Sequence, residues 1–159
     1  MVKKLGRLMS RALKVEGLEY VDIDFDLLKV VMKSVLQGEK KEYDSVSVLF
    51  VSDSEIRKMN KDYLGHDYST DVISFPLNDE PEKLEGEIYV SYETTKINSL
   101  NYSVSHSSEL LRVVIHGILH LVGYDDSTDS QKEEIKMKEE YYLQLAEISG
   151  ELKPGNERR

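Results

Sequence analysis

The chain has 159 residues, of which 40% are hydrophobic and 32% charged, and this suits one compact domain with a sizeable core. Its formal net charge of -9 excludes an overall basic coat for nucleic acid, although it is compatible with a local basic strip. The absence of cysteine excludes disulfides, thiolate zinc sites and a cysteine nucleophile, so any metal ligand must be His, Asp or Glu.

The distribution of charge and hydropathy predicts how the chain is organised. Residues 1–14 form a basic arm without acidic residues, residues 15–150 form a single domain, and residues 151–159 form a polar tail. The arm is a solvated segment or a phosphate contact. Arg7 and Arg11 interrupt its apolar residues, and no stretch reaches the roughly 18 apolar residues that a membrane span needs. We therefore expect a soluble cytoplasmic protein without a membrane partner.

Helices and short strands alternate irregularly along the domain. The expected helices run from Asp24 or Asp26 to Gly38, from a Ser52–Glu55 capping box over Ile56 and Met59, and over residues 91–101, 107–122 and 128–148. The expected strands lie around residues 46–50, at 72–75 before Pro76, and at 86–90. Without a steady βαβ rhythm, this order favours an α+β fold with a small mixed sheet of about four strands.

The helix expected at residues 107–122 is apolar on nearly all sides. A helix of this kind lies at the centre of a domain, with other helices around it. Its polar exceptions are Arg112, His116 and His120, which are spaced four residues apart and therefore share one face.

The two histidines on this face predict a metal site. His116 and His120 can direct their imidazoles to one point, as zinc ligands do, and a buried pair needs a partner such as a cation. Gly123 permits a reversal of the chain that brings Asp125 or Asp126 back under the histidines. We predict one zinc per chain, held by His116, His120 and Asp126, with a water in the open fourth position. His66 and His106 stand in polar contexts, and we expect both to face solvent.

The spacing of the ligands also matches metzincin zinc peptidases, which use H-E-x-x-H with the glutamate as general base. Gly117 occupies the position of that glutamate, and Met137 lies in a charged helix rather than in a Met-turn. Peptide hydrolysis is therefore the weakest of the enzymatic interpretations.

Three motifs follow one another along the chain. Residues 60–76 are similar to the pattern N-x-x-[YF]-R-x-x-D-x-P-T-D-V-L-S-F-P, residues 86–89 to G-[DE]-I-x-I, and the run HGILHLVGYDD at residues 116–126 to H-G-x-L-H-L-x-G-Y-D-H. Together they resemble the YbeY family of metal-dependent endoribonucleases in ribosomal RNA maturation. The resemblance extends over roughly residues 20–148.

Two positions depart from the family pattern. Asp126 replaces the usual third histidine, which lowers the charge of the site by one, and Leu64 replaces an arginine that is thought to contact RNA or aid catalysis. Arg112 is a candidate to supply the missing positive charge. Asp71 and Asp125 are candidate general bases, although each equally suits a cap or turn.

The resemblance implies a zinc-dependent, single-strand-specific endoribonuclease that acts in small-subunit ribosomal RNA maturation and ribosome quality control. Its partners would be single-stranded or ribosomal RNA and the small ribosomal subunit, with Thr70 and Ser74 as candidate phosphate contacts, and a monomer is slightly favoured. The alternative is a non-catalytic ribosome assembly factor with a structural metal site.

Overall fold

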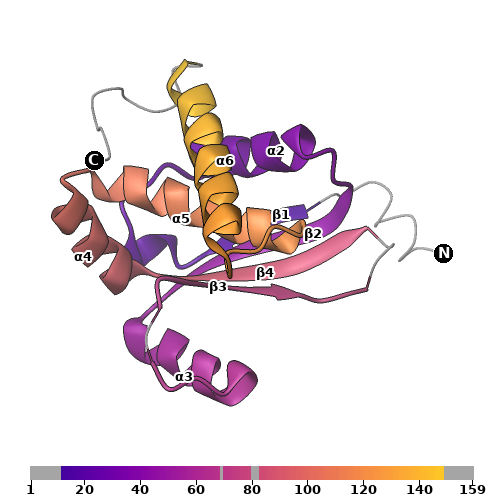
Figure 1. Cartoon of the computed structure of the whole chain (residues 1–159). Coiled ribbons are helices and arrows are strands. Elements are labelled where there is room, and N and C mark those ends of the chain that lie inside the picture. Colours follow the sequence, from indigo (N-terminus) through magenta and orange to yellow (C-terminus); the bar gives the residue numbers. More distant parts are fainter. Residues whose placement is uncertain (1–11, 69, 80–82, 149–159) are drawn as a thin grey trace.

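The computed structural model describes residues 12–68, 70–79 and 83–148 and confirms an α+β fold (Figure 1). In chain order the elements are β1 (Ala12–Glu16), the 3-10 helix η1 (Leu18–Tyr20), α2 (Phe25–Gly38), β2 (Tyr43–Val51), α3 (Asp53–Leu64), β3 (Val72–Pro76), β4 (Leu84–Ser91), α4 (Tyr92–Tyr102), α5 (His106–Leu121) and α6 (Asp129–Ile148).

The four-stranded sheet is mixed, as expected, and has the strand order β1-β2-β4-β3. The pairs β1–β2 and β2–β4 are parallel, whereas β3 pairs with β4 in antiparallel orientation and forms one edge. The three strands located from sequence are β2, β3 and β4. The fourth is β1, which begins within the segment expected as the basic arm. Residues 1–11 and the tail at 151–159 lie outside the described part of the chain.

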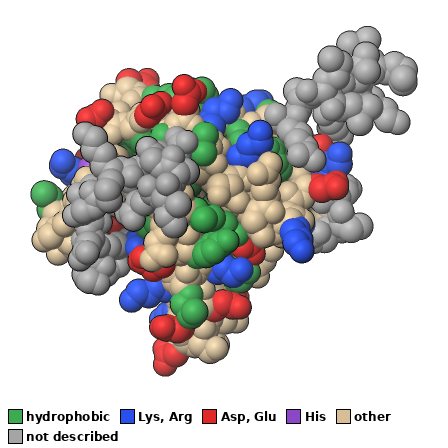
Figure 2. Space-filling model, turned by 90° about the horizontal axis from the view of Figure 1, so that it is seen from above, with side chains coloured by type: hydrophobic (Ala, Val, Ile, Leu, Met, Phe, Trp, Pro, Cys, Tyr) green, Lys and Arg blue, Asp and Glu red, His purple; other side chains and the backbone are tan. Residues whose placement is uncertain are grey.

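Helices α2, α4, α5 and α6 lie on one side of the sheet, and α3 lies on the other (Figure 1). Seen from the side of the helices, acidic and basic side chains are interspersed, and neither sign covers this face (Figure 2). Among the described residues no helix is both long and apolar enough to cross a membrane.

Helix α5 is the buried centre of the domain, as its sequence predicts, and it packs between the sheet and the helices α2, α4 and α6. Its fully buried apolar side chains are Leu110, Leu111, Val114, Ile115, Ile118 and Leu119. Burial on this scale is the main favourable term in folding, and it fixes the helix that carries both histidines.

Local signals set the helix ends. The Asp24 side chain accepts a hydrogen bond from the backbone N–H of Asp26, which makes Asp24 the N-cap of α2. At α3, the Ser52 hydroxyl accepts from the N–H of Glu55, and the Glu55 carboxylate accepts from the N–H of Ser52, each at 3.2 Å. The capping box expected from the sequence is therefore confirmed.

Candidate metal centre

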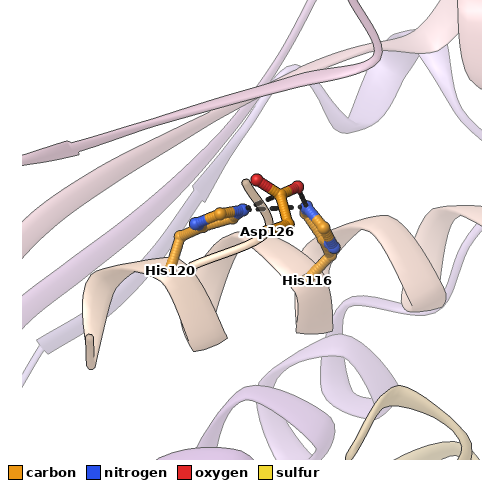
Figure 3. A group of neighbouring side chains, drawn as sticks. All are labelled: His116, His120 and Asp126. Atoms are coloured by element: carbon orange, nitrogen blue, oxygen red, sulfur yellow. Dashed lines mark hydrogen bonds and ion pairs between the residues drawn. The ribbon is translucent and has the colours of Figure 1, made fainter. Parts of the chain in front are cut away.

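The side chains of His116, His120 and Asp126 converge on one point (Figure 3). The Nε2 atoms of the two histidines are 3.0 Å apart, and the Oδ2 atom of Asp126 lies 3.5 Å from His116 Nε2 and 3.4 Å from His120 Nε2. Four-coordinate zinc with bonds of about 2.0–2.1 Å separates neighbouring ligand atoms by about 3.4 Å. The three donor atoms therefore fit one tetrahedral metal ion, with a fourth position left for another ligand.

The turn after α5 places the carboxylate. Gly123 adopts a positive φ of 114°, and its N–H donates to the carbonyl of His120. The N–H of Tyr124 donates to the carbonyl of Leu119, and the Tyr124 hydroxyl donates to Glu39 at 2.7 Å. These contacts end the helix and reverse the chain, so Asp126 returns beneath the two histidines. Tyr124 also packs against the core.

A buried carboxylate from α6 contacts the far side of one ligand. Glu139 Oε2 lies 2.6 Å from His116 Nδ1, and Glu139 Oε1 accepts from the guanidinium of Arg112 at 3.1 Å. Arg112 also forms an ion pair with Glu140. Burial lowers the pKa of His116, but the hydrogen bond and the charge of Glu139, helped by Asp71 and Asp126, outweigh it and raise the pKa above 6.5.

This contact orients His116 toward a cation. When Nδ1–H donates to the Glu139 carboxylate, the lone pair of Nε2 faces the shared point between the ligands. Carboxylate–histidine pairs of this kind fix the tautomer of metal-binding histidines and make them more basic. Glu139 therefore orients one candidate ligand, His116, without being a ligand itself.

A cavity of about 510 Å³ opens beside the three ligand groups, between them and the edge strand β3. It is lined by Asn60, Leu64, His66, Tyr68, Thr70, Asp71, Val72, Ile73, Ser74, Pro76, His116, His120, Leu121 and Asp126. Three candidates from the sequence, Thr70, Asp71 and Ser74, thus share the cavity with the ligands. The Ser74 hydroxyl donates to the carbonyl of Gly117 at 2.9 Å, which also ties β3 to α5.

Two other candidates do not reach this cavity. Arg112 was expected on the ligand face as a substitute cation, but it is 4% exposed and paired with Glu139 and Glu140. Its charge is used inside the protein because a buried guanidinium needs carboxylate partners. The carboxylate of Asp125 accepts from the N–H of Asp126 and from the Ser127 hydroxyl, which is a turn role, and it lines a different cavity.

The two remaining histidines differ from each other. His66 is exposed, as expected, and lies in the wall of the cavity. The expectation that His106 faces solvent is wrong, because it is half-buried at the start of α5 and its Nε2 lies 3.0 Å from the Thr95 hydroxyl. Burial, and then the charge of Lys96, lower the pKa of His106.

The position of Gly117 bears on the peptidase interpretation. A Cβ atom at Gly117 would lie 2.7 Å from the Ile88 side chain and 3.2 Å from Ser74 Oγ, so this face of α5 is pressed against the sheet. A glutamate in this position would have no room, and the general base of a metzincin therefore has no counterpart here.

Glu139 was missed by the sequence reasoning, although a signal was present. It lies on the same face of α6 as the buried residues Ile135, Tyr142, Leu143 and Ala146. An acidic residue within an apolar stripe at helical spacing marks a buried charge that needs a partner. His66 and Tyr68, in the wall of the cavity, carried no comparable signal.

Fold and site together define an α+β protein with a buried helix that offers two histidines and a nearby carboxylate, the ligand arrangement of metal-dependent hydrolases. The sequence model described as "Endoribonuclease YbeY" matches residues 18–147. The chain belongs to this family of endoribonucleases, enzymes that hydrolyse RNA.

Individual relatives agree with this assignment. The chain is 45% identical to "Endoribonuclease YbeY" of Chloroherpeton thalassium over 116 residues, which cover 73% of this chain and 82% of that protein. It is 40% identical to the protein of the same name from Chlorobaculum tepidum, over 76% of this chain and 88% of that one. The solution structure of TM1509 from Thermotoga maritima is similar, with a TM-score of 0.59 and 31% identity, over 92% of this chain and 100% of the other.

Proposed function

We propose that this chain is a zinc-dependent endoribonuclease that cuts single-stranded RNA during maturation and quality control of the small ribosomal subunit, in the cytoplasm. One zinc ion per chain would be held by His116, His120 and Asp126. The observation that carries the proposal is the convergence of these three donor atoms, 3.0–3.5 Å apart, at the wall of an open cavity in a member of an endoribonuclease family.

The metal ion and the side chains around the site would have different roles in the reaction. A bound zinc ion supplies a Lewis acid for a phosphodiester oxygen and lowers the pKa of a water molecule. Glu139 keeps His116 Nε2 directed at the site. Asp71 faces the same cavity and is the candidate proton acceptor, because a carboxylate there can receive a proton from an attacking water.

Two hydroxyls are candidates for holding the substrate. Thr70 lines the cavity, and its hydroxyl lies 3.5 Å from the carbonyl of Val72, which leaves it only loosely engaged. It can therefore turn to donate to a phosphate oxygen. The Ser74 hydroxyl already donates to Gly117, so it can only accept from a substrate. Thr70 is accordingly the stronger candidate phosphate contact.

The shape of the site favours an unpaired substrate. The cavity lies at the sheet edge, and its volume of about 510 Å³ suits a small ligand but not a helical duplex. Single-stranded RNA can turn one nucleotide out of its path and insert it into such a pocket, whereas a paired nucleotide must first be unstacked.

A non-catalytic assembly factor with a structural metal site is the second candidate. It is favoured by Leu64, which is 48% exposed in the cavity wall at the place where the family usually has arginine. In that case the metal would contribute to folding rather than to a reaction, and loss of a ligand would lower thermal stability without loss of any cleavage.

Cleavage of a labelled RNA with one unpaired segment and one hairpin separates the two candidates. We expect the zinc-loaded chain to cut within the unpaired segment, Asp71→Asn to cut at least tenfold more slowly, and His120→Ala to be inactive, because general-base catalysis is typically worth about 10²–10⁴. Intact RNA with the wild-type protein and with His120→Ala alike would contradict the nuclease and leave the assembly factor.

A further inference from the structure

Two aromatic rings lie side by side in the wall of the cavity at the candidate metal centre. His66 and Tyr68 are stacked, with ring centroids 5.4 Å apart and planes 14° from parallel. The Tyr68 hydroxyl and His66 Nδ1 are 3.2 Å apart, and Tyr68 is 55% exposed. Both residues line the cavity that also contains His116, His120 and Asp126. An exposed pair of rings beside a reactive centre is available to a planar ligand.

The backbone beneath the rings is held by a buried side chain. Asn60 is 2% exposed, and its Nδ2 donates to the carbonyl of Tyr68 at 2.9 Å. The N–H of His66 donates to the carbonyl of Asn60 at 3.1 Å, after Gly65 has ended α3 with a φ of 72°. Since Asn60 anchors both ring-bearing residues, the pair is positioned before any ligand arrives, which lowers the entropic cost of binding.

Among the described residues that line the same cavity there is neither lysine nor arginine, so none of these side chains supplies a permanent positive charge. Leu64 adds an apolar surface to the wall. The guanidinium of Arg57, on the preceding turns of α3, is paired with Asp67 at 3.0 Å. Apart from a bound metal ion and the Thr70 hydroxyl, the described cavity wall therefore offers little to attract a phosphate, whereas its exposed rings can contact the face of a planar ligand.

We propose that His66 and Tyr68 form a stacking site for one unpaired RNA base next to the scissile phosphate. This inference rests on the proposed function for the identity of the substrate as RNA. Aromatic side chains bind every base through its π-face, so the site would select unpaired over paired nucleotides without reading sequence. In this chain, stacking would supply the affinity that an arginine at position 64 would otherwise supply.

Binding of single-stranded DNA to the full-length, zinc-loaded protein tests the stacking site apart from cleavage, because DNA bases offer the same faces. One probe is a short labelled oligonucleotide, and the second has the same backbone with abasic sites throughout. The variants are Tyr68→Ala and His66→Ala, with Tyr68→Phe as the conservative replacement. Tyr63→Ala is the matched control, because Tyr63 is 71% exposed at the end of α3, just before the ring pair, and contacts Phe75, but does not line the cavity.

We expect Tyr68→Ala to weaken binding of the probe with bases by about tenfold, within the range of about 5- to 150-fold that loss of one stacked base implies. Tyr68→Phe and Tyr63→Ala should bind as the wild type does, His66→Ala should bind more weakly, and the abasic probe should bind equally to all variants. Circular dichroism melting should show that each variant is folded.

The proposal is overturned if Tyr68→Ala binds both probes as the wild type does, if it loses affinity for both equally, or if the wild-type protein does not distinguish the probes. The nuclease itself is tested separately by RNA cleavage. A chain that cuts RNA but binds both probes alike would retain the proposed function and lose the stacking site. A chain that prefers the probe with bases but never cuts would retain the stacking site alone.

Discussion

The two ends of α5 each carry a half-buried histidine, and these histidines have opposite electrostatic environments. At the first turn, His106 meets the neutral hydroxyl of Thr95, and burial together with Lys96 lowers its pKa. Near the other end, His116 meets the carboxylate of Glu139 at 2.6 Å, and its pKa is raised in spite of burial.

The difference shows that burial alone leaves a histidine neutral, whereas a carboxylate partner can outweigh it. At His106, burial and then the charge of Lys96 favour the neutral ring, and its contact with the Thr95 hydroxyl joins α4 to α5. A carboxylate partner behind His116 favours positive charge at the ring, whether that charge is a proton or a metal ion on Nε2. The site therefore depends on α6 as much as on the helix that bears its ligands.

Replacement of one histidine at each end gives the largest expected contrast. His116→Ala should abolish zinc binding and RNA cleavage, because two donors remain where three are needed. His106→Ala should leave zinc binding unchanged and should lower the free energy of unfolding by about 1 kcal/mol, the value of a typical hydrogen bond. Zinc titration and urea unfolding measure both effects. Equal zinc affinity in the two variants would remove the distinction between the ends.

Glu139→Gln tests the partner directly, because glutamine keeps the shape of the side chain but removes its charge. We expect zinc affinity to fall about 10- to 100-fold, as is typical when a group that orients a metal ligand is changed. Glu140→Gln is the matched control, since Glu140 also pairs with Arg112 but does not contact His116. If both variants bind zinc equally well, Glu139 has no orienting role.

Gly117→Ala probes the packing that holds α5 against the sheet. The added methyl group would lie 2.7 Å from Ile88, so the helix or the strand must shift. We expect the free energy of unfolding to fall by about 1–3 kcal/mol, the usual cost of overpacking. Urea unfolding measures this loss. A variant as stable as the wild type would show that the contact between α5 and β4 is looser than the structure indicates.

The smallest expected effect is on the pH dependence of stability in the chelated protein. The raised pKa of His116 stabilises the fold below the ordinary histidine value of about 6.5, and this contribution is lost as the pH rises through the folded pKa. The lowered pKa of His106 acts in the opposite direction, since stability falls as the pH drops below about 6.5.

Urea unfolding from about pH 5 to about pH 8, the range in which histidine titrates, can separate these contributions. His116→Gln should remove the loss of stability at higher pH, and His106→Gln should remove the loss in acid. If the free energy of unfolding depends on pH in both variants as it does in the wild type, the surroundings assigned to His116 and His106 are contradicted.

The sequence predicts the parts of the site that lie within one stretch of chain. His116, His120 and Asp126 are close in sequence, and helical spacing with a turn at Gly123 is enough to bring them together. The helices and three of the strands follow from periodicity and capping for the same local reason. Strand β1 was missed because it is only five residues long and begins within the basic segment at residues 1–14. Its place in the sheet comes from pairing with β2.

Contacts between distant segments were beyond the sequence reasoning. Glu139 meets His116 across 23 residues because α6 packs on α5, and no local pattern fixes that register. For the same reason Arg112 shares the helical face of the histidines and yet turns to the carboxylates of α6 instead of to the cavity. The burial of His106 likewise depends on α4.

Zinc titration into the chelated wild-type chain and into Asp126→Ala tests the central claim, that two imidazoles and one carboxylate share a divalent ion. We expect one zinc per wild-type chain and at least a tenfold weaker affinity in the variant, because the variant lacks one of three protein ligands. A wild-type chain that takes up no zinc, or an Asp126→Ala variant that binds it equally tightly, would contradict the account.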